Sequence, residues 1–236
     1  MLRWGGAAPT RKAEAETLAD HLFRVGAIDL RPHDFFVFPS GFTTPAYCDL
    51  RLVQSDVAAR TYIAGRLADA VRVRFLKNDG TAHNGDTTAQ APLTIVGVAT
   101  GGIAYATSVA DRLGLPLAYV RSAPKDHGQG RQVEGHLPAG SRCVVIDDVL
   151  GSGSAARAAV EALAKHGAVV LGVCAVFSYD FDTLVANVAA AGVPFVRLVD
   201  FALAVDRAQA NGLIDAAGAA AVTKWYAPRA TWRSSG

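Results

Sequence analysis

A regular alternation of apolar runs and helix-like segments in the second half of the chain constrains the fold most strongly. Strands are predicted at 93–98, 117–120, 143–149, 169–177 and 195–199, with helices at 103–113, 154–166, 183–191 and 203–211. Strands that are apolar along their whole length are typical of parallel sheets covered on both faces, and the helices supply the crossovers. We therefore predict an α/β fold with a central, mostly parallel sheet flanked by helices.

The first part of the chain is less regular. The predicted elements are a helix over 13–25 ended by Gly26, short strands over 35–38 and 47–50 around a turn at 39–41, and a helix capped by Ser55 that runs to about Phe75. The polar segment 77–92 is predicted to be a surface loop or insertion. We expect a single domain over 1–236, with an N-terminal arm or hood of about 1–55 and an aromatic C-terminal segment that packs on the α/β core.

Composition excludes several classes of protein. The chain has 236 residues, 51% of them hydrophobic, and a net charge of +2, which favours a globular domain and argues against nucleic-acid binding. Its three cysteines, Cys48, Cys143 and Cys174, have no CxxC spacing, so a structural zinc site is not expected. The N-terminus lacks the apolar core of a signal peptide, and no stretch is long enough to cross a bilayer. We expect a cytoplasmic protein without membrane contact.

The strand over 143–149 carries the most informative segment. Asp147 and Asp148 stand near its end, and the small-residue loop Gly151-Ser152-Gly153 leads directly into a helix. Ligands of open α/β sheets bind beyond the carboxyl ends of the strands, and free N–H groups at a helix start suit a phosphate. The two carboxylates suit ribose hydroxyls or a magnesium ion instead. The alternative is an ordinary capped helix with solvated acids.

This segment resembles the phosphoribosyl pyrophosphate signature of the type I phosphoribosyltransferases. The resemblance implies the type I phosphoribosyltransferase fold with a small N-terminal hood, contacts from both aspartates to the ribose hydroxyls, and a loop that wraps the 5′-phosphate. Gly151 and Ala155 stand where the family commonly has hydroxyl residues, so backbone amides must supply more of the binding. The implied site comprises Asp147, Asp148, Val149, Leu150, Gly151, Ser152, Gly153, Ser154 and Ala155.

A second strand–turn–helix junction contains Thr100, Gly101 and Gly102. Glycines there permit a close backbone approach to a ligand, although a tight βα connection explains them equally well. In the type I family this turn contacts pyrophosphate, which implies main-chain contacts here because the turn contains no lysine.

A long polar loop follows the strand over 117–120. It contains Arg121, Lys125 and His127, whose donors suit a pyrophosphate, although a solvated charged loop is the alternative. The pattern Arg-x-x-x-Lys-Asp-His-Gly, followed by Glu-Gly, resembles the orotate phosphoribosyltransferases. The resemblance implies a catalytic lid that closes over the site and reaches the neighbouring subunit of a homodimer. Ser122 and Ala123 stand where the family usually has further lysines.

The segment 40–51 resembles the orotate-side motif of the same family. Phe42 and Tyr47 could stack on a planar pyrimidine, and Arg51 could meet its carboxylate. A β-hairpin with aromatic core residues is the alternative. Thr43 stands near the place of a lysine that the family often has.

Together these motifs predict an enzyme of pyrimidine biosynthesis. The expected substrates are orotate and phosphoribosyl pyrophosphate, the products are orotidine 5′-monophosphate and pyrophosphate, and Mg²⁺ is the expected cofactor. Another type I phosphoribosyltransferase, acting on a purine or other base, is one alternative. A non-catalytic regulator that keeps the nucleotide-binding fold, for example an RNA-binding repressor, is the other, although it would need a basic stripe.

Overall fold

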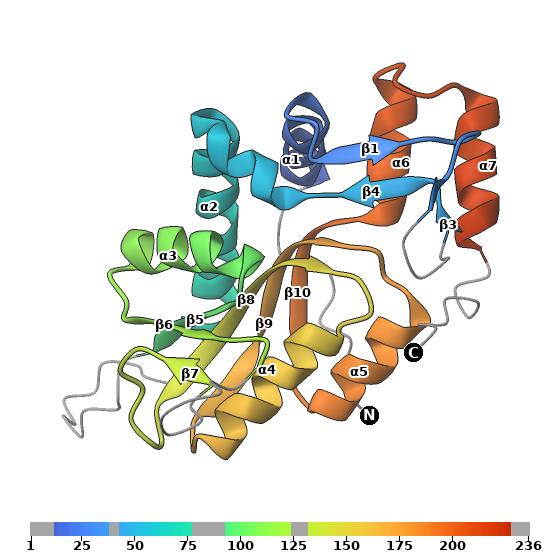
Figure 1. Cartoon of the computed structure of the whole chain (residues 1–236). Helices are drawn as coiled ribbons and strands as arrows, with labels where there is room; N and C mark the ends of the chain where they lie inside the picture. The colour runs from blue at the N-terminus through green and yellow to red at the C-terminus, as the bar shows by residue number, and fades with distance from the viewer. Residues whose placement is uncertain (1–11, 38–42, 77–92, 124–131, 228–236) are drawn as a thin grey trace.

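A computed structural model of the chain describes residues 12–37, 43–76, 93–123 and 132–227. Its centre is a six-stranded sheet in the order β10-β9-β8-β5-β6-β7 (Figure 1). The strands are β5 (Thr94–Val98), β6 (Leu117–Val120), β7 (Val133–Glu134), β8 (Arg142–Leu150), β9 (Val169–Ser178) and β10 (Phe195–Asp200). All neighbouring strands are parallel except β6 and β7. The predicted mostly parallel sheet is therefore confirmed.

Helices cover both faces of this sheet. Helices α2 (Val57–Val71) and α3 (Gly101–Leu113) lie on one face, where they pack with Ile95 and Val144. Helices α4 (Ser154–Lys165) and α5 (Asp182–Ala191) lie on the other, where Val96 and Val145 join their core cluster. Successive strand residues point to opposite faces of the sheet. A strand that is apolar throughout is therefore buried on both faces.

The N-terminal elements form a smaller layer beyond the carboxyl edge of the sheet (Figure 1). They are α1 (Lys12–Arg24), β1 (Ile28–Leu30), β2 (Phe36–Val37), β3 (Thr43–Thr44) and β4 (Ala46–Cys48). Strand β1 pairs antiparallel with β4, and β2 pairs antiparallel with β3. The extent of a hood over 1–55, and the single domain over 1–236, stay predictions.

The C-terminal helices α6 (Phe201–Ala210) and α7 (Ala216–Tyr226) brace this layer. The Arg207 guanidinium on α6 donates to Asp20 on α1 at 2.8 Å, and Trp225 Nε1 on α7 donates to the Thr43 carbonyl at 3.2 Å. The ring of Trp225 also lies near those of Phe181 and Phe201, with centroids 6.1 and 6.2 Å away. These contacts involve the described part of the C-terminal aromatic segment; the domain arrangement as a whole stays a prediction.

Several predicted boundaries were wrong. The cap of α2 is Asp56, not Ser55, because the Asp56 carboxylate accepts the Ala59 N–H at 2.7 Å. Ser55 instead ends a 3₁₀ helix over Leu50–Ser55, so the strand predicted for 47–50 stops at Cys48. Helix α2 ends at Val71, and a π-helical turn continues over Arg72–Leu76.

Other differences concern elements that the sequence did not indicate. The short strands β1 and β7 and the helix α7 were not expected; α7 begins where the Asp215 carboxylate accepts the Gly218 N–H at 2.7 Å. Residues 1–11, the predicted turn at 39–41 and the segment 77–92 lie outside the described residues. Within the described parts of the chain, no helix is both long and apolar enough to cross a membrane.

Candidate active site

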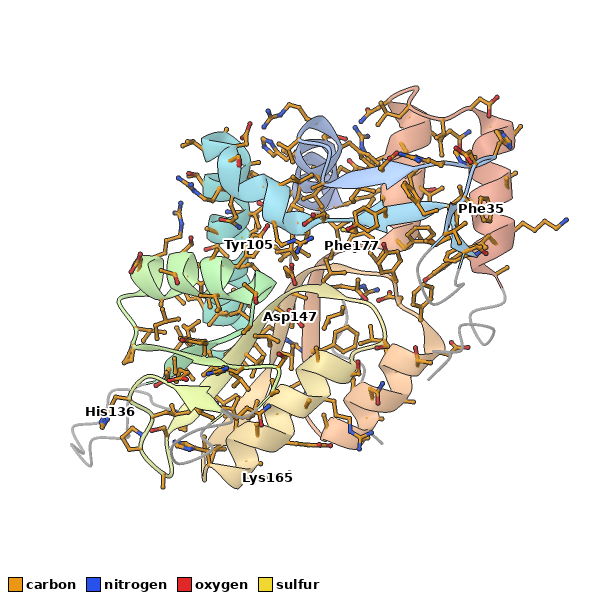
Figure 2. All side chains as sticks on the ribbon, viewed as in Figure 1. Phe35, Tyr105, His136, Asp147, Lys165 and Phe177 are labelled. Atoms are coloured by element: carbon orange, nitrogen blue, oxygen red, sulfur yellow. The ribbon has the colours of Figure 1, made fainter. Side chains whose placement is uncertain are left out.

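Two acidic residues lie at the carboxyl end of β8, in the middle of the sheet. Figure 2 places Asp147 at this edge, and its side chain is only 5% exposed. Burial, together with the neighbouring charge of Asp148, raises the pKa of the Asp147 carboxyl well above its ordinary value. Each carboxylate accepts the following backbone N–H at 2.9 Å, Asp147 from Asp148 and Asp148 from Val149. The strand thus presents two fixed carboxylates, one deeply buried.

The first turn of α3 packs directly against these acids. A Cβ on Gly101 would collide with the Asp148 carboxylate, and one on Gly102 would lie 2.5 Å from the Ile146 carbonyl oxygen. Only glycine therefore lets the helix begin at this position. The sequence suggested that these glycines allow a ligand to approach the backbone. The structure shows that they allow the close contact between α3 and β8. The preceding peptide bond, Ala99–Thr100, is cis.

The starts of α3 and α4, near the acid pair, have no carboxylate cap that would exclude an anion. Asp56, Asp200 and Asp215 cap α2, α6 and α7 with their carboxylates. By contrast, no side-chain cap bond is made by the cap residues of α3, α4 and α5, which are Thr100, Gly153 and Phe181. A carboxylate cap would repel a phosphate, whereas an uncapped start offers N–H groups and a partial positive charge.

The loop before α4 is arranged by its own hydroxyl groups. Ser152 Oγ lies 2.9 Å from Ser154 Oγ and accepts the Ser154 N–H at 3.3 Å. Gly153 has φ +77°, a conformation that favours glycine. Leu150 is buried and Gly151 has open space beside it, so the loop from 151 onward can approach a ligand. The two aspartates of β8 and the loop over 151–155 lie at the same edge of the sheet; their roles in binding stay predictions.

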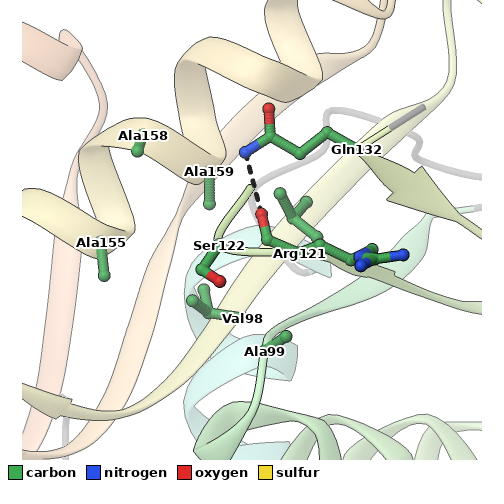
Figure 3. Close-up of a pocket in the computed structure, with 9 residues that line it drawn as sticks. Val98, Ala99, Arg121, Ser122, Gln132, Ala155, Ala158 and Ala159 are labelled. Atoms are coloured by element: carbon green, nitrogen blue, oxygen red, sulfur yellow. Dashed lines mark hydrogen bonds between the residues drawn. The ribbon is translucent and has the colours of Figure 1, made fainter. Parts of the chain in front are cut away.

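A small pocket of about 80 Å³ lies between the ends of β5 and β6 and the first turns of α4 (Figure 3). Arg121 and Ser122 line it from the β6 side, and Ala155 lines it from α4. The Arg121 backbone is fixed by Gln132, whose Nε2 donates to the Arg121 carbonyl at 2.8 Å. The Arg121 guanidinium lies 3.7 Å from the Glu134 carboxylate. Arg121 therefore stands at the predicted edge, and an anion there would compete with Glu134 for it.

The 3₁₀ helix after β4 joins the N-terminal layer to this edge. Tyr105, fully buried on α3, donates its hydroxyl to the Leu50 carbonyl at 2.7 Å. Arg51 pairs with Asp49 through two bonds of 2.7 and 2.8 Å. Asp49 is the main cause of the raised pKa of the Arg51 guanidinium, and the charge of Asp148 also contributes. Arg51 is thus already paired, but within electrostatic reach of the acid pair.

The predicted orotate-side residues are only partly described. Tyr47 is 38% exposed, and its ring centroid lies 5.7 Å from that of Phe36. Phe42, and the predicted catalytic residues Lys125 and His127, lie outside the described residues. The sequence did not single out Tyr105, because the signal is a tertiary contact between α3 and residue 50.

Comparison with known proteins decides the family. Residues 76–195 match the family model described as a phosphoribosyl transferase domain. An orotate phosphoribosyltransferase of Cutibacterium acnes is 36% identical over 223 residues, which cover 94% of this chain and 97% of that protein. The chain belongs to the orotate phosphoribosyltransferase family.

Other members of this family are similar to the chain in sequence and in fold. The orotate phosphoribosyltransferase of Levilactobacillus brevis is 38% identical over 211 residues, covering 89% of this chain and 94% of that protein. The solved orotate phosphoribosyltransferase of Aeropyrum pernix superposes with a TM-score of 0.63 at 27% identity, covering 80% of this chain and 98% of that one. The predicted type I phosphoribosyltransferase fold is therefore confirmed.

Proposed function

We propose that this chain transfers the phosphoribosyl group of phosphoribosyl pyrophosphate to orotate, giving orotidine 5′-monophosphate and pyrophosphate in pyrimidine (UMP) biosynthesis. The observation that carries the proposal is the acid pair of β8, with Asp147 buried, beside the starts of α3 and α4, whose cap residues make no side-chain cap bond. It occurs in a chain that aligns over nearly its whole length with orotate phosphoribosyltransferases.

The reaction is a displacement at the anomeric carbon of the ribose. The bond to the pyrophosphate oxygen breaks as a ring nitrogen of orotate, which has lost its proton, bonds to the opposite face of the anomeric carbon. Positive charge grows on the sugar and negative charge on the leaving group, so positioning and electrostatic stabilisation provide most of the catalysis. We assign the ribose hydroxyls to Asp147 and Asp148, and the 5′-phosphate to the amides of 150–155.

The pyrophosphate and orotate are assigned to other parts of the site. We assign the pyrophosphate to the N–H groups of Thr100, Gly101 and Gly102, where the partial positive charge of α3 favours it. The lid residues Arg121, Lys125 and His127 would neutralise its growing charge and exclude water. Orotate would lie against Phe42 and Tyr47, with its carboxylate near Arg51.

We also propose Mg²⁺ as the cofactor. In the described parts of the chain no group of three or more His, Cys, Asp or Glu side chains is arranged to hold a metal. Asp147 and Asp148 provide two carboxylates, and Mg²⁺ commonly combines one or two carboxylates with substrate phosphate oxygens. When bound, the ion would supply charge neutralisation for the departing pyrophosphate.

The test is pyrophosphate release by the purified chain with Mg²⁺, phosphoribosyl pyrophosphate and a panel of bases. We expect turnover with orotate and little or none with adenine, hypoxanthine or uracil. Turnover with a purine but not with orotate would establish the alternative base specificity. RNA binding without any turnover would favour the regulator.

We further propose a homodimer in which the loop over 121–131 acts across the interface. The test mixes two inactive variants, Lys125→Ala and the double variant Asp147→Asn/Asp148→Asn. Half of the randomly exchanged dimers are mixed, and each restores one of two sites, so roughly a quarter of wild-type activity should return. No recovery after verified subunit exchange would show that the loop serves its own subunit. Cytoplasmic localisation stays a prediction.

A further inference from the structure

Helix α5 forms a wall behind the loop that precedes α4. A Cβ on Gly153 would lie 2.5 Å from Leu184 Cδ1 and 3.6 Å from Asn187 Cβ. Leu184 and Asn187 are three residues apart and therefore share one face of α5. Leu184 fills the space beside Gly153, and the amide side chain of Asn187 contacts the polar backbone of the loop.

Asn187 makes one specific bond to this backbone. Its Nδ2 donates to the Ser152 carbonyl at 2.9 Å, in a partly buried position. The carbonyl of Ser152 and the N–H of Gly153 belong to one planar trans peptide, so they point in opposite directions. Fixing the carbonyl toward α5 thus directs the Gly153 N–H away from α5. We propose that Asn187 is a positioning residue for the 5′-phosphate of phosphoribosyl pyrophosphate, an inference that rests on the proposed function.

The peptide needs such an anchor because it can turn over. Gly153 accepts φ of either sign, so rotation of the Ser152–Gly153 peptide meets little steric resistance. A flipped peptide would present a carbonyl oxygen, with its partial negative charge, where the loop should present an N–H donor to the phosphate. The bond from Asn187 holds the carbonyl on the far side and keeps the loop in its donor state before substrate arrives.

Arg157 fixes the orientation of the Asn187 amide. Its Nη1 donates to Asn187 Oδ1 at 3.3 Å, so the oxygen faces the guanidinium and the NH₂ group faces Ser152. The Nε of the same guanidinium donates to Glu161 at 2.7 Å. Glu161 contacts the guanidinium but not the loop, and it therefore offers a matched control.

The experiment measures phosphoribosyl pyrophosphate binding by calorimetry, with Mg²⁺, for wild type, Asn187→Ala, Asn187→Asp and the control Glu161→Gln. Steady-state constants and melting temperatures are measured alongside. The aspartate keeps the shape and the contact with Arg157 but cannot donate to the Ser152 carbonyl. We expect Kd and KM for phosphoribosyl pyrophosphate to rise about 5–10-fold in both Asn187 variants, which corresponds to about one hydrogen bond.

Other parameters should stay near wild type. The 5′-phosphate does not change charge during the reaction, so kcat should change less than about twofold, as should KM for orotate. Glu161→Gln should bind like wild type. Unchanged substrate affinity in the Asn187 variants would overturn the proposal, as would an equal loss in Glu161→Gln. A lowered melting temperature with equal rises in both KM values would likewise overturn it in favour of a general structural role.

The binding measurement also separates this inference from the proposed function. If wild type binds phosphoribosyl pyrophosphate but does not turn over orotate, the proposed function fails. The titration of the Asn187 variants then still decides whether Asn187 positions the loop.

Discussion

Replacing Gly102 by alanine tests whether the close contact of α3 with β8 is a requirement of the site. The added Cβ would lie 2.5 Å from the Ile146 carbonyl oxygen and 3.1 Å from the Asp147 Cα, and both are backbone atoms. Because Cβ contacts are essentially never shorter than 3.0 Å and ordinary contacts begin at 3.4 Å, the helix must retreat by roughly 0.5–0.9 Å. Overpacking of this kind costs about 1–3 kcal/mol, or about 2–4 °C of melting temperature per kcal/mol in a chain of this size.

Gly65→Ala is the matched control. Gly65 lies inside α2 with nothing within 4 Å of an added Cβ, so the substitution should stabilise the protein by about 0.5–1 kcal/mol. Thermal and urea unfolding, with kcat/KM for both substrates, would be measured for the two variants. We expect Gly102→Ala to lower the free energy of unfolding and Gly65→Ala to raise it. Only Gly102→Ala should lose activity. A Gly102 variant as stable and active as wild type would refute the assignment of this glycine to the contact.

Gly101→Ala should behave differently from Gly102→Ala. Its Cβ would meet the carboxylate of Asp148, the end of a side chain that can rotate, rather than backbone. The cost should therefore appear in catalysis more than in stability. We expect KM for phosphoribosyl pyrophosphate to rise while the melting temperature changes by less than in Gly102→Ala.

Three further changes test the electrostatics of the site and the fold. Lys125→Ala should lower kcat by at least ~10²-fold, as loss of a transition-state charge partner does; Lys165→Ala, at the far end of α4 (Figure 2), should not. The pKa of Asp147 is raised in the folded state, so its ionisation costs stability as pH rises above roughly 4. Asp147→Asn should therefore lose turnover yet melt at or above wild type at pH 7, with the difference shrinking as pH falls; loss of a cooperative melt would indicate a structural role. The pKa of Asp56 is lowered, chiefly by Arg24, so Asp56→Ala should reduce the melting temperature most above about pH 4 and progressively less in acid. A pH-independent reduction would contradict the assignment.

The central sheet and the phosphate loop were predictable because their signals are local. The run 143–146 is apolar throughout because both faces of the sheet are buried there, and the acids and the small-residue loop follow directly in the same segment. The cap of α2 shows the limit of such signals. Ser55 and Asp56 are both good caps, and the choice depends on where the preceding 3₁₀ helix ends.

Contacts between distant segments could not be predicted in this way. Strand β1 has three residues and pairs with β4 across an intervening strand pair, and no residue pattern of that length identifies a partner. The bond from Asn187 to Ser152 joins residues 35 positions apart. Both contacts depend on the packing of whole elements. The surroundings of the site were therefore less predictable than the strand β8 and the loop that follows it.

The bond from Trp225 to the Thr43 carbonyl ties the N-terminal layer to a helix that is synthesised after the whole central sheet. A nascent chain released up to residue 200 already contains all six strands of the sheet and the starts of α3 and α4. The N-terminal layer, which would select the base, gains its supporting helices α6 and α7 only after residue 200 has been added. A truncation or fusion after residue 200 should therefore affect selectivity for the base more than binding of the sugar phosphate.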